Sequence, residues 1–189
     1  MDASSLIDSL LLVMLLGLSA FFSGSETALF SLSRLAVSRL EKQVEHQNSK
    51  KIIYLLSSPG RLLITILIGN MVVNITASAI ATKLAMRFFG PTGISIAIGI
   101  MTFLLLIFGE ITPKTYAVEH HSSFALYAAG PLCRISRVLS PIISALKYLN
   151  DRLVQVGGQT EKPEYSYLTA EGLRTMIKVS EREGILKEE

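Results

Sequence analysis

The chain has 189 residues, of which 50% are hydrophobic and 17% are charged, and its formal net charge is +3. Soluble domains carry about 25% charged residues, so this composition excludes an ordinary soluble domain and is typical of a membrane protein. The single cysteine, Cys133, excludes an internal disulfide.

Three apolar segments have the length of membrane spans, at residues of about 6–32, 62–86 and 94–112. A helix needs about 20 apolar residues to cross a bilayer core, and each segment reaches or nearly reaches that length. The first begins without the basic residues of a secretory signal, so we expect it to be retained. Residues 89–93 (FGPTG) predict a tight turn between the second and third spans.

Basic residues predict the orientation, because cytoplasmic loops are enriched in lysine and arginine. The second connection has only Lys83 and Arg87, and the N-terminal tail has none. We therefore expect a multi-pass protein of the plasma or inner membrane, with its N-terminus outside and its C-terminus in the cytoplasm. The first connection carries the remaining basic residues of this region: Arg34, Arg39, Lys42, Lys50, Lys51 and Arg61.

A fourth apolar segment, residues 124–149, contains two prolines and two arginines and is a poor span. Apolar residues in its second half share one helical face, which is the pattern of a helix lying in the membrane interface. A helix packed on a soluble domain and a distorted fourth span are the alternatives. The residues of this face are Ile135, Val138, Leu139, Ile142, Ile143, Leu146, Leu149 and Leu153.

The chain becomes polar after Val156, with a linker (GGQTEKP) and a charged stretch that predicts a soluble helix capped by Thr169. The expected fold is an all-α membrane protein with three transmembrane helices and amphipathic juxtamembrane helices on the cytoplasmic side, over about residues 118–156. The transmembrane domain is expected over residues 1–156, and a cytoplasmic linker helix over residues 157–189.

Polar residues interrupt all three spans. Such groups are costly in a bilayer and are candidates for function. At a rise of about 1.5 Å per residue, the three clusters lie at similar depths in the cytoplasmic half, so they could converge on one site. The clusters are Ser23, Gly24, Ser25 and Glu26 in the first span, Gly69, Asn70 and Asn74 in the second, and Gly109, Glu110 and Thr112 in the third.

Two positions predict departures from regular helix. Ser23 and Ser25 would point about 200° apart in a continuous helix. Gly24 between them would allow the backbone to leave the helix, so that a hydroxyl and a main-chain carbonyl face the same way. Pro113 lacks an N–H, and it is expected to leave the carbonyl of Gly109 without its partner, beside a carboxylate.

The clusters offer hydroxyl, amide, carboxylate and main-chain oxygens, and the spans contain no histidine or cysteine. Oxygen ligation with one or two carboxylates selects a hard cation such as Mg²⁺, Ca²⁺ or Na⁺ and argues against zinc or copper. A purely structural interpretation competes, because Ser can bond to a carbonyl four residues back, Asn can join helices and Gly can permit close packing. Glu110 is the hardest to explain in that way. We expect Glu26 to pair or to brace the helix, and Asp8, near the outer surface, to be solvated.

Three motifs in combination resemble the transmembrane (DUF21) domain of the CNNM and CorC magnesium transporters: SGSETALFSLSR in the first span, GN in the second and GEITPK in the third. The resemblance covers almost the whole chain. The tail resembles the linker to that family's cytosolic CBS-domain pair, which this sequence does not include. The resemblance implies a homodimer with three spans per protomer that exports Mg²⁺, with Na⁺ coupling proposed.

By motif position, the resemblance implies that Ser25, Asn70 and Glu110 are side-chain ligands of the metal and that Ser23 and Gly109 offer carbonyls. The residues expected to support or gate this site are Gly24, Glu26, Asn74, Thr112, Pro113 and Lys114.

The expected function is thus Mg²⁺ export through an all-oxygen site that is open to the cytoplasm. A membrane anchor or Mg²⁺ sensor that presents cytosolic domains is the first alternative. A Na⁺- or H⁺-coupled transporter of an organic solute is the second, and it would need a larger cavity. We do not expect an enzyme, because the spans hold no His, Cys or Asp pair that could act as base or nucleophile. The expected partners are a second copy, the bilayer and Mg²⁺, without nucleic acid.

Overall fold

The computed structural model describes residues 3–33, 36–37, 47–146 and 148, and all regular structure in this part of the chain is helical. The predicted all-α class is therefore confirmed for these residues. The linker helix predicted over residues 157–189 lies outside them. The helices are α1 (Ala3–Phe30), α3 (Gln47–Leu56), α4 (Pro59–Phe89), the 3₁₀ helix η1 (Gly90–Thr92), α5 (Gly93–Leu104), the π-helix η2 (Leu105–Ile111), α6 (Thr112–Glu119) and α7 (His121–Val138).

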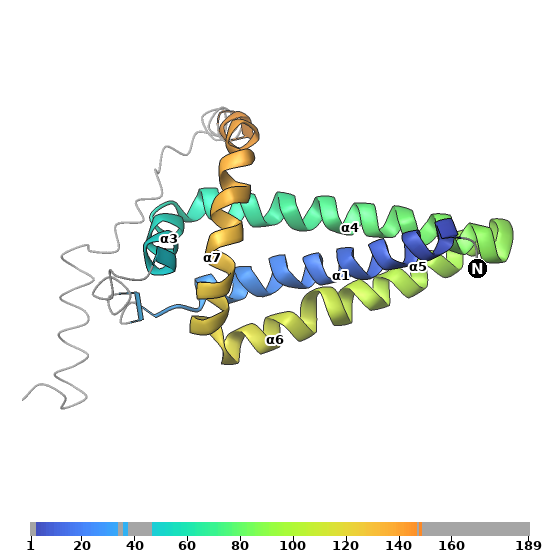
Figure 1. Cartoon of the computed structure of the whole chain (residues 1–189), viewed down its shortest axis with the longest axis horizontal. Helices are drawn as coiled ribbons and strands as arrows, with labels where there is room; N and C mark the ends of the chain where they lie inside the picture. The colour runs from blue at the N-terminus through green and yellow to red at the C-terminus, as the bar shows by residue number, and fades with distance from the viewer. Residues whose placement is uncertain (1–2, 34–35, 38–46, 147, 149–189) are drawn as a thin grey trace, which may run out of the picture. The chain divides into compact units, whose positions relative to one another are not determined.

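Three helical rods lie side by side: α1, α4, and the continuous segment of α5, η2 and α6 (Figure 1). They correspond to the three predicted spans. α1 and α4 run antiparallel, because Asp8 near the start of α1 contacts Lys83 near the end of α4. α7 crosses the rods at the end where α4 begins, and it packs against α3 (Figure 1).

Two helical segments of the described chain are long and apolar enough to cross a membrane, Ala3–Phe30 and Pro59–Glu119. The second segment turns back on itself at Gly90, whose φ of 63° is in the left-handed region that favours glycine. α5 then packs closely on α4, since a Cβ at Gly93 would lie 2.3 Å from the carbonyl oxygen of Ala85. The turn predicted at residues 89–93 is confirmed.

α1 is an uninterrupted α-helix, so the predicted departure from the helix at Gly24 is wrong. The hydroxyl of Ser25 donates a hydrogen bond to the carbonyl of Phe21 at 2.6 Å, which satisfies it without a break in the helix. Gly24 instead makes room for a neighbour, because a Cβ there would lie 2.7 Å from the ring of Phe124 in α7. The glycine serves close packing rather than backbone freedom.

The helix predicted in the second half of residues 124–149 is also divided. α7 already begins at His121 and ends at Val138, and a turn at Leu139 precedes a further helix over residues 140–146. Pro141 lies in the first turn of the second helix, where proline is well tolerated, whereas Pro131 lies inside α7 without dividing it. The predicted apolar face is therefore not continuous, and Val138 is 76% exposed.

The rods have apolar outer surfaces and polar groups inside. Leu10, Ile75 and Phe103 are each more than 60% exposed. This arrangement is unusual for a soluble protein and is expected for helices whose outer faces contact lipid, where polar groups must find partners in the interior. Within α1 and α4, the buried hydroxyls are those of Ser5, Ser19, Ser23, Ser25 and Thr65.

Candidate functional site

Ser19 is the point at which α1, α4 and η2 meet. Its fully buried hydroxyl donates a hydrogen bond to Oδ1 of Asn70 in α4 at 3.2 Å. The same oxygen lies 2.8 Å from the position that a Cβ would take at Gly109 in η2. Only a glycine at position 109 therefore allows η2 to approach this closely. Two of the predicted site residues, Asn70 and Gly109, are brought together in this way.

The sequence prediction did not include Ser19. The sequence feature that could have indicated Ser19 is its spacing of four residues from Ser23, which places both side chains on one face of a helix. The predicted cluster began at Ser23 because Ser19 lies alone in an apolar run.

Two buried oxygens lie one helical turn from this junction without a hydrogen-bond partner in the described part of the chain. One is Oγ of Ser23, and the other is Oδ1 of Asn74. A buried polar atom without a partner costs about 1–3 kcal/mol, so each calls for an explanation. Each atom is a neutral oxygen donor of the kind that Mg²⁺ and Na⁺ accept, but because α1 and α4 run antiparallel the two lie about 6 Å to either side of the junction and do not share one ion.

Ser25 is fully buried on a different side of α1 from Ser23. Its hydroxyl proton is used in the bond to Phe21, and none of its described hydrogen bonds reaches Asn70 or η2. The structure therefore does not bring Ser25 into the junction at Ser19. Because a hydroxyl that donates keeps two lone pairs, the predicted role of Ser25 as a ligand stays a prediction.

The third rod widens into the π-helix η2 where it carries Gly109. The N–H of Thr112 bonds to the carbonyl of Ile107, five residues back. In a π-helix the N–H of residue 113 would bond to the carbonyl of Phe108, and in an α-helix to the carbonyl of Gly109. Pro113 has no N–H and can make neither bond. In either register one carbonyl at this level loses a partner. Single π-turns of this kind are frequent at functional sites.

Glu110 lies in η2 directly after Gly109, and its side chain is partly exposed. No hydrogen bond or ion pair within the described residues involves its carboxylate. No group of three or more His, Cys, Asp or Glu side chains is found in this part of the chain that could hold a metal. Glu110 is thus the acidic residue next to Gly109 in the chain, and no described contact joins its carboxylate to Ser19 or Asn70.

The end of the bundle nearest α7 carries an ion pair between Glu26 of α1 and Lys114 of α6, at 3.7 Å. The two side chains are 37% and 44% exposed, so water screens the pair and its contribution to stability is at most about 1 kcal/mol. Thr112, another predicted supporting residue, is exposed at the start of α6.

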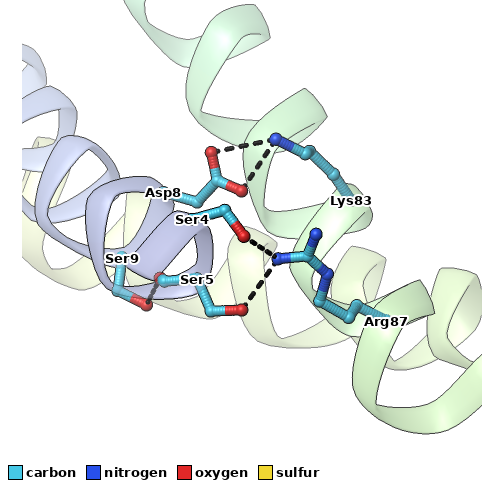
Figure 2. Close-up of polar contacts among 6 residues, drawn as sticks. All are labelled: Ser4, Ser5, Asp8, Ser9, Lys83 and Arg87. Carbon is cyan, nitrogen blue, oxygen red and sulfur yellow. Dashed lines mark hydrogen bonds and ion pairs between the residues drawn. The ribbon is translucent and has the colours of Figure 1, made fainter. Parts of the chain in front are cut away.

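The opposite end of the bundle is closed by a second polar cluster (Figure 2). Asp8 is only 9% exposed and pairs with Lys83 at 2.7 Å. Arg87 donates hydrogen bonds to the hydroxyls of Ser4 and Ser5, each at 2.8 Å. The expectation that Asp8 is solvated is wrong, because the neighbouring α4 covers the carboxylate and supplies the cation that a covered charge requires.

The fold and the junction at Ser19 define a helical membrane domain with a polar interior. Residues 10–189 match the cyclin M transmembrane N-terminal domain (CNNM), and the chain belongs to this family. It is 37% identical over 168 residues to a UPF0053 protein of Haemophilus influenzae, with 89% of this chain and 40% of the relative covered.

Two further relatives are similar over most of the chain. A chloroplastic DUF21 domain-containing protein of Arabidopsis thaliana is 39% identical over 181 residues, which are 95% of this chain and 27% of the relative. The UPF0053 inner membrane protein YfjD of Escherichia coli is 35% identical over 161 residues, which are 85% of this chain and 37% of the relative. The chain thus spans between about a quarter and two-fifths of the length of these relatives.

Proposed function

We propose that this chain is the membrane domain of a Mg²⁺ exporter and that the ion binds at the junction of α1, α4 and η2. The observation that carries the proposal is the convergence of Asn70 and Gly109 on the buried hydroxyl of Ser19. Glu110 directly follows Gly109 in the chain, and the proposal assigns its carboxylate, which has no described protein partner, to the ion.

The chemistry of the donors suits a hard cation. The side-chain carbonyl of Asn70 has two lone pairs, and Ser19 uses one of them, so the other remains for a metal. Ser23 and Asn74 have further buried oxygens without partners, one turn to either side of the junction rather than at it. Mg²⁺ gives up its water reluctantly and is usually bound through one or two carboxylates, a role that the proposal gives to Glu110. Na⁺ accepts the same donors and is the proposed coupling ion.

In this proposal α1, α4 and the segment from α5 to α6 are the three membrane spans, with the N-terminus outside. The Glu26–Lys114 pair then lies at the cytoplasmic mouth. The cluster of Asp8 and Lys83 closes the outer end, so export requires that end to open when the ion is bound. We further propose that the domain forms a homodimer in the inner or plasma membrane and that a CBS-domain pair in the remainder of the full-length protein supplies regulation.

The test is Mg²⁺ flux from proteoliposomes that contain a magnesium indicator, with Glu110→Gln as the central variant. This change keeps the shape of the side chain and removes the charge that offsets the ion. We expect flux to be lost and Mg²⁺ affinity by calorimetry to fall at least about tenfold, which corresponds to about 1.4 kcal/mol. Glu119→Gln, at the exposed end of α6, is the matched control and should transport normally.

Wild-type flux in Glu110→Gln would contradict the proposal. Mg²⁺ binding without flux in the unmodified, folded protein would instead favour the alternative, in which the domain is a membrane anchor or sensor that presents cytosolic domains.

A further inference from the structure

The helices α3 and α7 carry positive charge without any negative charge of their own. α3 contains Lys50 and Lys51, and α7 contains Arg134 and Arg137. Neither helix has an aspartate or a glutamate. The two helices pack against each other, so their cations are brought to one region of the surface.

The side chain of Lys51 reaches over α7. Its Nζ lies 3.8 Å from the position that a Cβ would take at Gly130, which is an ordinary contact distance. Arg134 and Arg137 follow Gly130 by four and seven residues, which places all three on one face of the helix. The thiol of Cys133 lies between them and contacts the main-chain carbonyl of Lys51 at 3.8 Å. Burial raises the pKa of this thiol, and the charges of Lys51 and Arg137 oppose the rise.

The face that carries these cations is open. Arg134 and Arg137 are exposed, and so are Tyr127 and Val138 on the same side of α7, at 71% and 76%. Exposed aromatic, aliphatic and basic side chains on one helix are characteristic of the boundary between lipid tails and headgroups. The end of the bundle that α7 crosses is therefore suited to that boundary (Figure 1).

We infer that Lys51, Arg134 and Arg137 form a binding site for the phosphate of an anionic phospholipid headgroup. Three like charges on one exposed face repel one another, and a bound phosphate removes this repulsion while Tyr127 and Val138 contact the adjoining acyl chain. Arginine is well suited to phosphate because its guanidinium can donate two parallel hydrogen bonds. The lipid site is separate from the junction at Ser19, so the test of lipid binding does not depend on whether the protein transports an ion.

The test is native mass spectrometry of the whole chain released from detergent, with phosphatidylglycerol and phosphatidylcholine of the same acyl chains as probes. The unmodified protein should retain phosphatidylglycerol preferentially. Each neutralised cation (Lys51→Gln, Arg134→Gln or Arg137→Gln) should lower its affinity about fivefold, and the triple variant roughly 100-fold, to the level of phosphatidylcholine. Arg134→Lys keeps the charge and should retain most of the binding.

Arg87→Gln, which removes one positive charge at the opposite end of the bundle, is the matched control and should bind phosphatidylglycerol normally. Equal retention of the two lipids by the unmodified protein would overturn the inference, and so would unchanged binding in the triple variant or an equal loss in Arg87→Gln. Displacement of the lipid by an equal concentration of inorganic phosphate would overturn the assignment to a lipid and indicate a site for free phosphate. Unchanged helical circular dichroism in every variant ensures that a loss of lipid reports on the site.

Discussion

The hydroxyl of Ser19 and the side-chain carbonyl of Asn70 lie 3.2 Å apart, although 51 positions separate the two residues in the chain. Their hydrogen bond joins α1 to α4 in the polar interior of the bundle, and Gly109 of η2 lies against the same hydroxyl. One short side chain thus sets both the orientation of the Asn70 amide and the distance to the π-helix.

Ser19→Ala should weaken Mg²⁺ binding without abolishing it. The variant keeps the packing of the Cβ and removes the hydrogen bond that orients Asn70, which is worth about 0.5–1.5 kcal/mol. We expect the dissociation constant from calorimetry to rise about threefold to tenfold. Ser144→Ala removes an exposed hydroxyl far along the chain that bonds only to its own helix, and it should leave binding unchanged. Equal effects of the two changes would show that Ser19 has no particular role.

Gly109→Ala should lower the thermal unfolding midpoint in detergent, because the added Cβ would lie 2.8 Å from Oγ of Ser19. Overpacking of this kind costs about 1–3 kcal/mol. In the Ser19→Ala background the nearest remaining atoms are at 3.5 Å, which is ordinary contact, so the same change should cost less there. A double-mutant cycle with a coupling below about 0.5 kcal/mol would contradict this contact.

Gly69→Ala and Gly99→Ala should have different effects on the stability of the bundle. A Cβ at Gly69 would lie 2.4 Å from the ring of Phe22, whereas nothing lies within 4 Å of a Cβ at Gly99. We expect Gly69→Ala to destabilise the bundle and Gly99→Ala to be neutral or to stabilise its helix by up to about 1 kcal/mol. Unfolding midpoints of the two variants, measured in one detergent, make the comparison.

The Asp8–Lys83 pair should respond asymmetrically to substitution (Figure 2). Lys83→Gln leaves a covered carboxylate unpaired and should cost about 2 kcal/mol, while Asp8→Asn leaves a lysine that is 59% exposed and can be hydrated, at a cost of about 1 kcal/mol. The double variant should resemble Asp8→Asn alone. Thermal unfolding of the three proteins checks this, and strictly additive costs would show that the pair is not coupled.

The thiol of Cys133 should react slowly with iodoacetamide at neutral pH. Burial raises the pKa of this thiol, and Lys51 and Arg137 oppose the rise. Since the thiolate is the reactive form, the rate should increase only as the pH passes above the ordinary range of a cysteine. Removing the two cations with Lys51→Gln and Arg137→Gln should raise the pKa of the thiol further and make the reaction slower than in the unmodified protein. A faster reaction in that double variant would show that the cations do not act on the thiol.

Several features of the site were predictable from the chain alone. Asn70, Gly109 and Glu110 stand out because polar groups are rare in apolar runs, and two of the three lie at the junction. Ser19 and the Asp8–Lys83 pair were not predictable, because each depends on which faces of two distant helices are turned toward each other. The role of Gly24 within a continuous α1 was not predictable, since the ring of Phe124 that packs against it belongs to a segment 100 positions along the chain.

The amino-acid sequence by itself determined that this membrane protein is helical, with oxygen-bearing residues at particular positions along its apolar helices. This follows from local physics, because an apolar run in lipid can satisfy its backbone only as a helix. The tertiary structure alone decided which oxygens meet, which side chains are paired and where glycine gives space. Those outcomes depend on the rotation and register of one helix against another, and residues far apart in the chain set them together.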